Sequence, residues 1–160
     1  MRGSISMGRL WGIPFYISYT WFVIFVIVTA SLVFGQFPRS YPGWSDATYV
    51  FVGIITSLLF FASVVAHELA HGLVASSLGV PVISITLFIF GGIAQIGREA
   101  PRPQGELVIA AVGPFSSLAL AALFGLVWIV ARPFHDPTAA VAGWLAVINL
   151  SLAAFNLVPG

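Results

Sequence analysis

Residues 47–78 read ATYVFVGIITSLLFFASVVAHELAHGLVASSL, a run that contains a single acidic side chain and no lysine or arginine. A helix needs roughly twenty apolar residues to cross a hydrocarbon core about 30 Å thick, so this run is long enough to span a membrane. Gly79 and Pro81 follow it and are typical helix stop signals. The run therefore predicts a transmembrane helix, and this helix carries two histidines and a glutamate within HELAH, residues 67–71.

The whole chain shares this apolar character. Hydrophobic residues make up 59% of it and charged residues 7%, whereas about a quarter of the residues of a soluble domain are charged. The net charge is +1 and no basic run occurs, which excludes nucleic-acid binding, because phosphate contacts need clustered Lys or Arg. The chain has no Cys, so disulfides and thiolate metal sites are excluded, and a bound metal must use His, Asp, Glu or water.

Four apolar stretches predict a membrane all-α bundle of about four transmembrane helices in one domain, residues 1–160. The predicted spans are residues 15–34, 47–78, 106–131 and 138–157. Polar links that contain proline separate them, at 35–46, 98–105 and 132–137. Gly113-Pro114 predicts a kink in the third span, because proline removes a backbone donor and clashes with the preceding turn.

Residues 82–97 differ from the predicted spans. They are rich in β-branched and aromatic side chains and are interrupted by Gly91-Gly92, which favours a short β-hairpin or a re-entrant stretch over a helix. Strands with unpaired backbone groups cannot face lipid, so we expect this segment to be buried in protein, to line a wet cavity or to lie at the membrane interface.

The arginines indicate the orientation of the chain. They are unevenly divided between the two predicted membrane faces, and under the positive-inside rule the richer face is cytoplasmic. The protein is thus expected to be a multi-pass protein of the cell membrane, with its amino terminus and the His67 end of the second span toward the cytoplasm. The richer face collects Arg2, Arg9, Arg98 and Arg102, and the other face has Arg39 and Arg132.

His67, Glu68 and His71 form the candidate catalytic group. Residues four apart share one face of a helix, so the two imidazoles can bind one metal ion, with Glu68 beside them to take a proton from water. Zinc suits these ligands and favours hydrolysis of an amide. Ionisable residues inside a span are costly unless paired, which makes a function more probable than a polar cluster that only satisfies neighbouring helices. Haem ligation is disfavoured, since axial ligands must approach opposite faces of the iron.

A catalytic zinc normally has three protein ligands, and the third is not evident from the residues. Asp46 precedes His67 by 21 residues, about 30 Å of helix, and is expected near the opposite face with Asp136. Glu99 and Glu106 are on the correct side, but solvated charges flanking a span are the more probable interpretation. His135 is expected to be an exposed interfacial residue, and Asn156-x-x-Pro159 taken alone is typical of a helix end.

Together, these features resemble the site-2 protease family of intramembrane zinc metalloproteases over nearly the whole chain. The features are HELAH in the second span, Gly91-Gly92, Gly113-Pro114 and the terminal Asn156-Leu157-Val158-Pro159. The opening residues 2–14 are also similar to the short extended start of bacterial and archaeal members, which often carry regulatory CBS domains after the protease core.

The resemblance implies a core in which His67 and His71 bind Zn²⁺ and Glu68 is the general base. It also implies a later aspartate as the third ligand, within a longer pattern that begins at Asn156. The sequence ends one residue after Pro159, so we expect a core truncated at its carboxyl end and lacking that ligand. Asn156 matches the family asparagine that helps to position substrate or stabilise an oxyanion.

The implied substrates are membrane-anchored regulatory proteins, cut within or close to a transmembrane segment. Gly91 and Gly92 are candidates for an edge that pairs with an unwound substrate strand, although a hairpin that only fills the fold is equally probable. Two alternatives to a zinc endopeptidase stay open: a non-catalytic relative that binds membrane segments, and a transporter-like bundle that uses the histidines for ion passage. No residue pattern specifies an oligomeric state.

Overall fold

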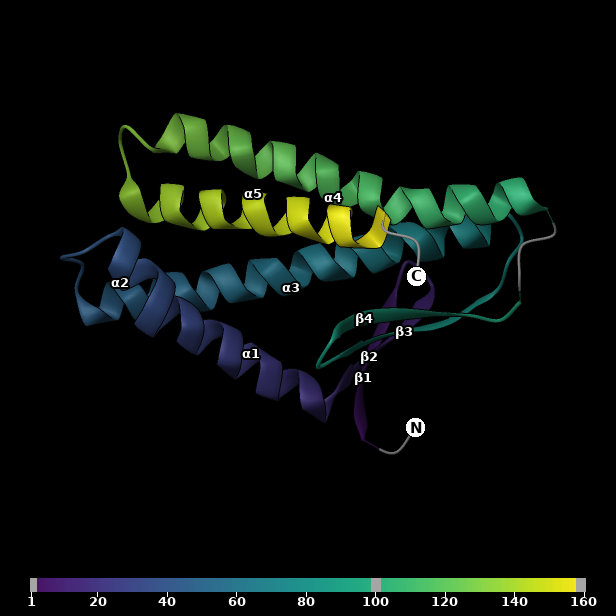
Figure 1. Ribbon diagram of the computed structural model, residues 1–160. Coiled ribbons are helices and arrows are strands. Elements are labelled where there is room, and N and C mark those ends of the chain that lie inside the picture. Colours follow the sequence, from purple (N-terminus) through teal and green to yellow (C-terminus); the bar gives the residue numbers. More distant parts are fainter. Residues whose placement is uncertain (1–2, 99–101, 158–160) are drawn as a thin grey trace.

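Four helices that are long and apolar enough to cross a membrane dominate the computed structural model, which describes residues 3–98 and 102–157 (Figure 1). The prediction of about four such helices is confirmed. The central helix is α3 (Asp46–Ser77), which lies between α1 (Tyr19–Ser31) and the antiparallel pair formed by α4 (Pro103–Ala131) and α5 (Asp136–Leu157). The four candidate spans are Tyr19–Ser40, Asp46–Ser77, Pro103–Ala131 and Asp136–Leu157.

The first span differs from its prediction at both ends. Helix α1 (Tyr19–Ser31) begins after Ser18, whose hydroxyl accepts a hydrogen bond from the backbone N–H of Thr20 (3.3 Å). It continues through a π-helical turn, η1 (Leu32–Gln36), into α2 (Phe37–Ser40). The predicted start at residue 15 is wrong because Ile13–Ser18 forms a strand.

A four-stranded sheet lies beside the carboxyl-terminal half of α3 (Figure 1). Its strands are β1 (Ser4–Leu10), β2 (Ile13–Ser18), β3 (Val82–Phe88) and β4 (Gly91–Ile96), in the order β1-β2-β3-β4. The two hairpins are antiparallel, and β2 pairs with β3 in parallel. The hairpin predicted within residues 82–97 is confirmed, whereas the all-α class is wrong because the amino terminus adds a second hairpin.

The sheet packs on α3 through a small apolar core. Val64 and Leu69 of α3 contact inward-facing residues of β2 and β3, among which Ile85 is fully buried. Alternate residues of a strand point to opposite faces, so these inward positions attach one face of the sheet to the helix. The sheet is thereby fixed against the turns of α3 that carry HELAH.

Helices α4 (Pro103–Ala131) and α5 (Asp136–Leu157) complete the bundle. Helix α4 runs without a break through Pro114, which lies in its interior. Buried polar contacts connect α3 to its neighbours: Thr29 Oγ1 of α1 lies 2.9 Å from Ser57 Oγ, and Asn149 Nδ2 of α5 lies 3.3 Å from Ser63 Oγ. A hydrogen bond between apolar helices satisfies groups that lipid cannot satisfy.

Gly53 of α3 packs closely against Val33 of η1, so we expect that no side chain is tolerated at position 53. A Cβ at Gly53 would overlap Val33 Cγ2 of η1, and a β-branched valine in a helix has little rotamer freedom with which to yield. We expect Gly53→Ala to destabilise the protein by about 1–3 kcal/mol. The measurement is thermal unfolding in detergent, with Gly125→Ala in α4 as the matched control, because nothing lies within 4 Å of a Cβ there. Equal losses for both variants would contradict this packing.

Candidate metal centre

The two histidines of HELAH direct their Nε2 atoms at one point. His67 is 1% exposed, His71 is half-buried, and their Nε2 atoms lie 3.2 Å apart. Two nitrogens bound tetrahedrally to one zinc at 2.0–2.1 Å would be roughly 3.3 Å apart. The pair therefore fits two positions of a single metal ion.

Helix α4 supplies the outer hydrogen bonds of both imidazoles. His71 Nδ1 donates to the backbone carbonyl of Ile109 (2.6 Å), and His67 Nδ1 lies 2.8 Å from Ser117 Oγ. A carbonyl can only accept, so the His71 proton is on Nδ1 and its Nε2 presents a lone pair. Such second partners fix the ring orientation and tautomer of metal-binding histidines.

Gly113 allows α4 to approach the two imidazoles. A Cβ at Gly113 would overlap His71 Nε2 and would lie 2.7 Å from His67 Nε2. Gly113-Pro114 was predicted to kink the helix and was counted among the family features, but neither the contact of Gly113 with the histidines nor a role for Ser117 was predicted. The four-residue spacing of Gly113 and Ser117, which places both on one helix face, was the signal that could have identified them.

Glu68 points to the sheet. Its Oε2 accepts a hydrogen bond from the backbone N–H of Ala94 in β4 (3.1 Å). A Cβ at Gly92 would lie 2.5 Å from Glu68 Cγ, whereas nothing lies within 4 Å of one at Gly91. Of the two glycines predicted for a substrate edge, the structure thus brings Gly92 against the candidate base.

The Asn156 side chain, near the end of α5, lies beside His67. Its Nδ2 also donates to the Leu152 carbonyl (2.8 Å), and the residue is exposed. Helix α5 therefore brings the predicted asparagine to the same end of α3 as the histidines, although they are distant in sequence.

No third acidic or histidine ligand joins His67 and His71 among the described residues, where no group of three His, Cys, Asp or Glu occurs. Asp46 and Asp136 lie in the first turns of α3 and α5, at the opposite end of the bundle, and Glu106 is exposed in the first turn of α4. Glu99 and the terminal Pro159 lie outside the described residues.

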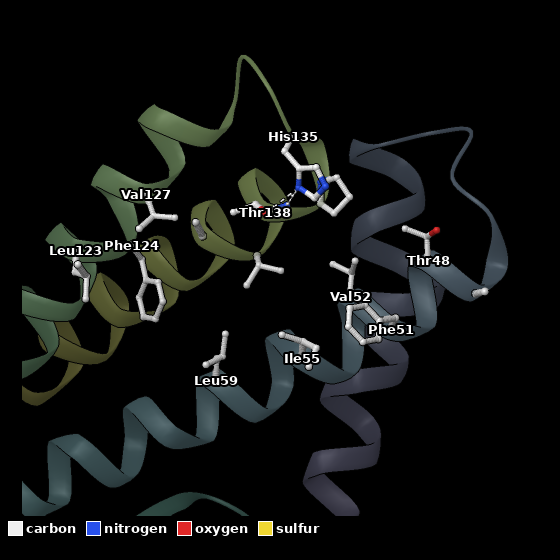
Figure 2. A pocket seen from close by; sticks show the side chains of 14 residues that line it. Thr48, Phe51, Val52, Ile55, Leu59, Leu123, Phe124, Val127, His135 and Thr138 are labelled. Carbon is white, nitrogen blue, oxygen red and sulfur yellow. Dashed lines mark hydrogen bonds between the residues drawn. The ribbon is translucent and has the colours of Figure 1, made fainter.

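A large apolar pocket lies away from the histidines, between the amino-terminal half of α3 and the α4–α5 pair (Figure 2). Its volume is about 730 Å³, and aliphatic and aromatic side chains line most of it. His135 lies at its edge, with Nδ1 2.8 Å from Thr138 Oγ1 and accepting a hydrogen bond from the Thr138 N–H (3.3 Å). His135 is exposed, and its bond to the Thr138 N–H stabilises the start of α5.

Known proteins match both the sequence and the fold of this chain. The model of Peptidase family M50 matches residues 55–138. The chain is 46% identical over its full length to a Synechocystis protein named "Putative zinc metalloprotease sll0528", and 40% identical to "Putative zinc metalloprotease Rip3" of Mycobacterium tuberculosis. It spans 41% of the length of each of these relatives.

A solved structure agrees with these matches. The site-2 protease from Methanocaldococcus jannaschii superimposes with a TM-score of 0.63 and 28% sequence identity. The superposition covers 98% of this chain and 65% of the other.

The outer hydrogen bond from Ser117 predicts a measurable effect on metal binding. We expect Ser117→Ala to weaken zinc binding about 10–100-fold, because His67 loses the partner that orients its ring. Competition with a fluorescent chelator in detergent measures this affinity. Ser116→Ala is the control, since the Ser116 hydroxyl bonds to the Gly113 carbonyl (2.7 Å) and to neither histidine. Equal affinities for the two variants would show that Ser117 does not orient the site.

Proposed function

The chain belongs to peptidase family M50, the site-2 protease family, and from this membership we propose that it is a zinc-dependent endopeptidase of membrane proteins. Its substrates in this proposal are membrane-anchored proteins, cut within or near a transmembrane segment. The observation that carries the proposal is the convergence of His67 and His71, with Nε2 atoms 3.2 Å apart, on a helix apolar enough to span a membrane.

In the proposed site, each residue has a separate role. His67 and His71 hold the zinc, which when bound polarises the substrate carbonyl and makes water more acidic. Ser117 and the Ile109 carbonyl orient the two rings. Glu68 accepts a proton from the attacking water and returns it to the leaving amide nitrogen. The Asn156 amide, beside His67, is proposed to donate a hydrogen bond to the substrate carbonyl.

The proposed substrate-binding element is β4, around Gly91 and Gly92. It stands at the end of the strand order, so no strand of the described sheet pairs with its outer side, where the Ala94 N–H donates to Glu68. An extended peptide could pair with the remaining backbone groups on that side. A transmembrane helix must unwind locally before its peptide bond can be attacked, and pairing with a strand satisfies the backbone groups that unwinding exposes. The contact of Gly92 with Glu68 would bring such a strand next to the base.

A second function is favoured by one observation, the presence of only two candidate metal ligands in the described part of the chain. A non-catalytic relative would bind membrane segments on β4 without cutting them. It would have the same fold and helix contacts, but it would form no cleavage product and would not need Glu68 as a base.

Replacing the base separates the two functions. We expect Glu68→Gln to lower cleavage at least about 100-fold while zinc content stays unchanged, because the amide cannot take a proton. The probe is a fluorogenic peptide that contains one apolar span of about 20 residues. Its cleavage is measured with probe and protein together in detergent. Wild-type protein that holds zinc and leaves this probe intact would support the non-catalytic relative.

The same inactive protein tests the substrate edge. A probe with a cysteine at mid-span is expected to form a disulfide with Gln95→Cys on β4, because the chain has no other cysteine. Ser6→Cys on β1, at the other free edge of the sheet, is the matched control. Preferential trapping on β1 would overturn the role of β4.

The proposed topology places the sheet and the HELAH end of α3 at the cytoplasmic face of the cell membrane, following the arginine bias. Gln104 lies in the first turn of α4 and Phe134 lies just beyond its last residue, and both are exposed. In intact cells we expect a membrane-impermeant thiol reagent to label Phe134→Cys and to spare Gln104→Cys. Labelling of Gln104→Cys alone would reverse the orientation.

A further inference from the structure

The outer side of β4, which is the side away from β3, faces the candidate base Glu68. Ala94 pairs with Ile85 in the antiparallel β3–β4 ladder, yet its N–H points to Glu68 of α3. In such a ladder every second residue directs its backbone groups away from the partner strand, so Gly92 shares this outward side with Ala94. Side chains two apart also share one sheet face, which at residues 92 and 94 is the face toward Glu68.

Two independent contacts hold the Glu68 carboxylate on this strand. The Ala94 N–H donates to Oε2 (3.1 Å), a hydrogen bond strengthened by the negative charge of its acceptor. The second contact is the close approach at Gly92, where a Cβ would lie 2.5 Å from Cγ, 3.1 Å from Cδ and 3.3 Å from Oε1 of Glu68. A side chain at position 92 would therefore push the whole carboxyl group off the strand.

We propose that β4 positions the general base: the Ala94 amide holds the Glu68 carboxylate, and the absence of a side chain at Gly92 provides the space it occupies. This inference rests on the proposed function, in which Glu68 is the base. Ala94 and Gly92 act as positioning residues, because they reach the reaction only through Glu68. The hydrogen bond engages Oε2 and leaves Oε1 to take the proton.

Positioning has a kinetic consequence because Glu68 has an unbranched side chain that rotates freely when nothing holds it. A general base must lie within hydrogen-bond reach of the proton it removes. Misplacement by about 1 Å can lower a rate about 100-fold. The sheet, fixed to α3 through Ile85 and Leu69, supplies a rigid support for this side chain.

A disulfide test measures the geometry without metal, substrate or activity. We expect the pair Glu68→Cys and Gly92→Cys to oxidise readily in the presence of a chelator, since Cβ atoms about 3.5–4.5 Å apart suit a disulfide. The control pair is Glu68→Cys with Ile93→Cys, whose side chain lies on the other sheet face and is 52% exposed. Thiol alkylation followed by mass spectrometry counts the free cysteines, of which the natural sequence has none. Equal oxidation of both pairs, or none at 68 and 92, would overturn the proposal.

A kinetic test then separates positioning from a structural role. We expect Gly92→Ala to lower kcat about 100-fold with little change in KM or zinc content. Ala94→Pro, which removes the N–H, should likewise lower kcat with little change in KM or zinc content. A raised KM or a loss of zinc in proportion to the loss of kcat, for either variant, would contradict positioning.

The two proposals fail in different ways. If Glu68→Gln keeps full cleavage, Glu68 is not the base and the proposed function is wrong. If Glu68→Gln is inactive but residues 68 and 92 do not form a disulfide, only the positioning by β4 is wrong.

Discussion

Hydrogen bonding of polar side chains buried on α3 is the constraint on which the arrangement of the other helices depends. A polar group away from water costs free energy unless it has a partner, and apolar helices offer few. Helix α3 meets this requirement in part with hydrogen bonds between its own side chains and side chains of α1, α4 and α5. These contacts are Thr29–Ser57 from α1, Asn149–Ser63 from α5 and Ser117–His67 from α4. His67, a candidate metal ligand, is thus part of the same interactions that order the bundle.

The helices were predictable from the sequence because apolar length is a local property. Helices α3, α4 and α5 begin within three residues of their predicted spans. The β1–β2 hairpin was not predicted, since Phe15–Ser18 continues directly into the apolar run of α1. Short apolar segments do not distinguish strand from helix. The pairing of Phe15 with Ile85 is a long-range contact that no local pattern specifies.

The candidate site was predictable in part because the spacing of residues along one helix is also a local property. The four-residue spacing of His67 and His71 places them on one helix face, and the structure brings their Nε2 atoms together. Gly113 and Ser117 contribute only through the packing of α4 on α3, which spacing within α3 cannot reveal. Gly92 was predicted for a substrate edge, and its contact with Glu68 gives it a second reason to lack a side chain.

In the proposed site, His67 and His71 share one zinc ion. X-ray absorption at the zinc edge of the purified protein tests it directly, because it counts imidazole ligands and gives their distances. We expect two histidine nitrogens at about 2.0–2.1 Å with oxygen ligands and no sulfur, and one fewer imidazole in His67→Ala. A spectrum with no imidazole shell, or one unchanged by His67→Ala, would contradict it.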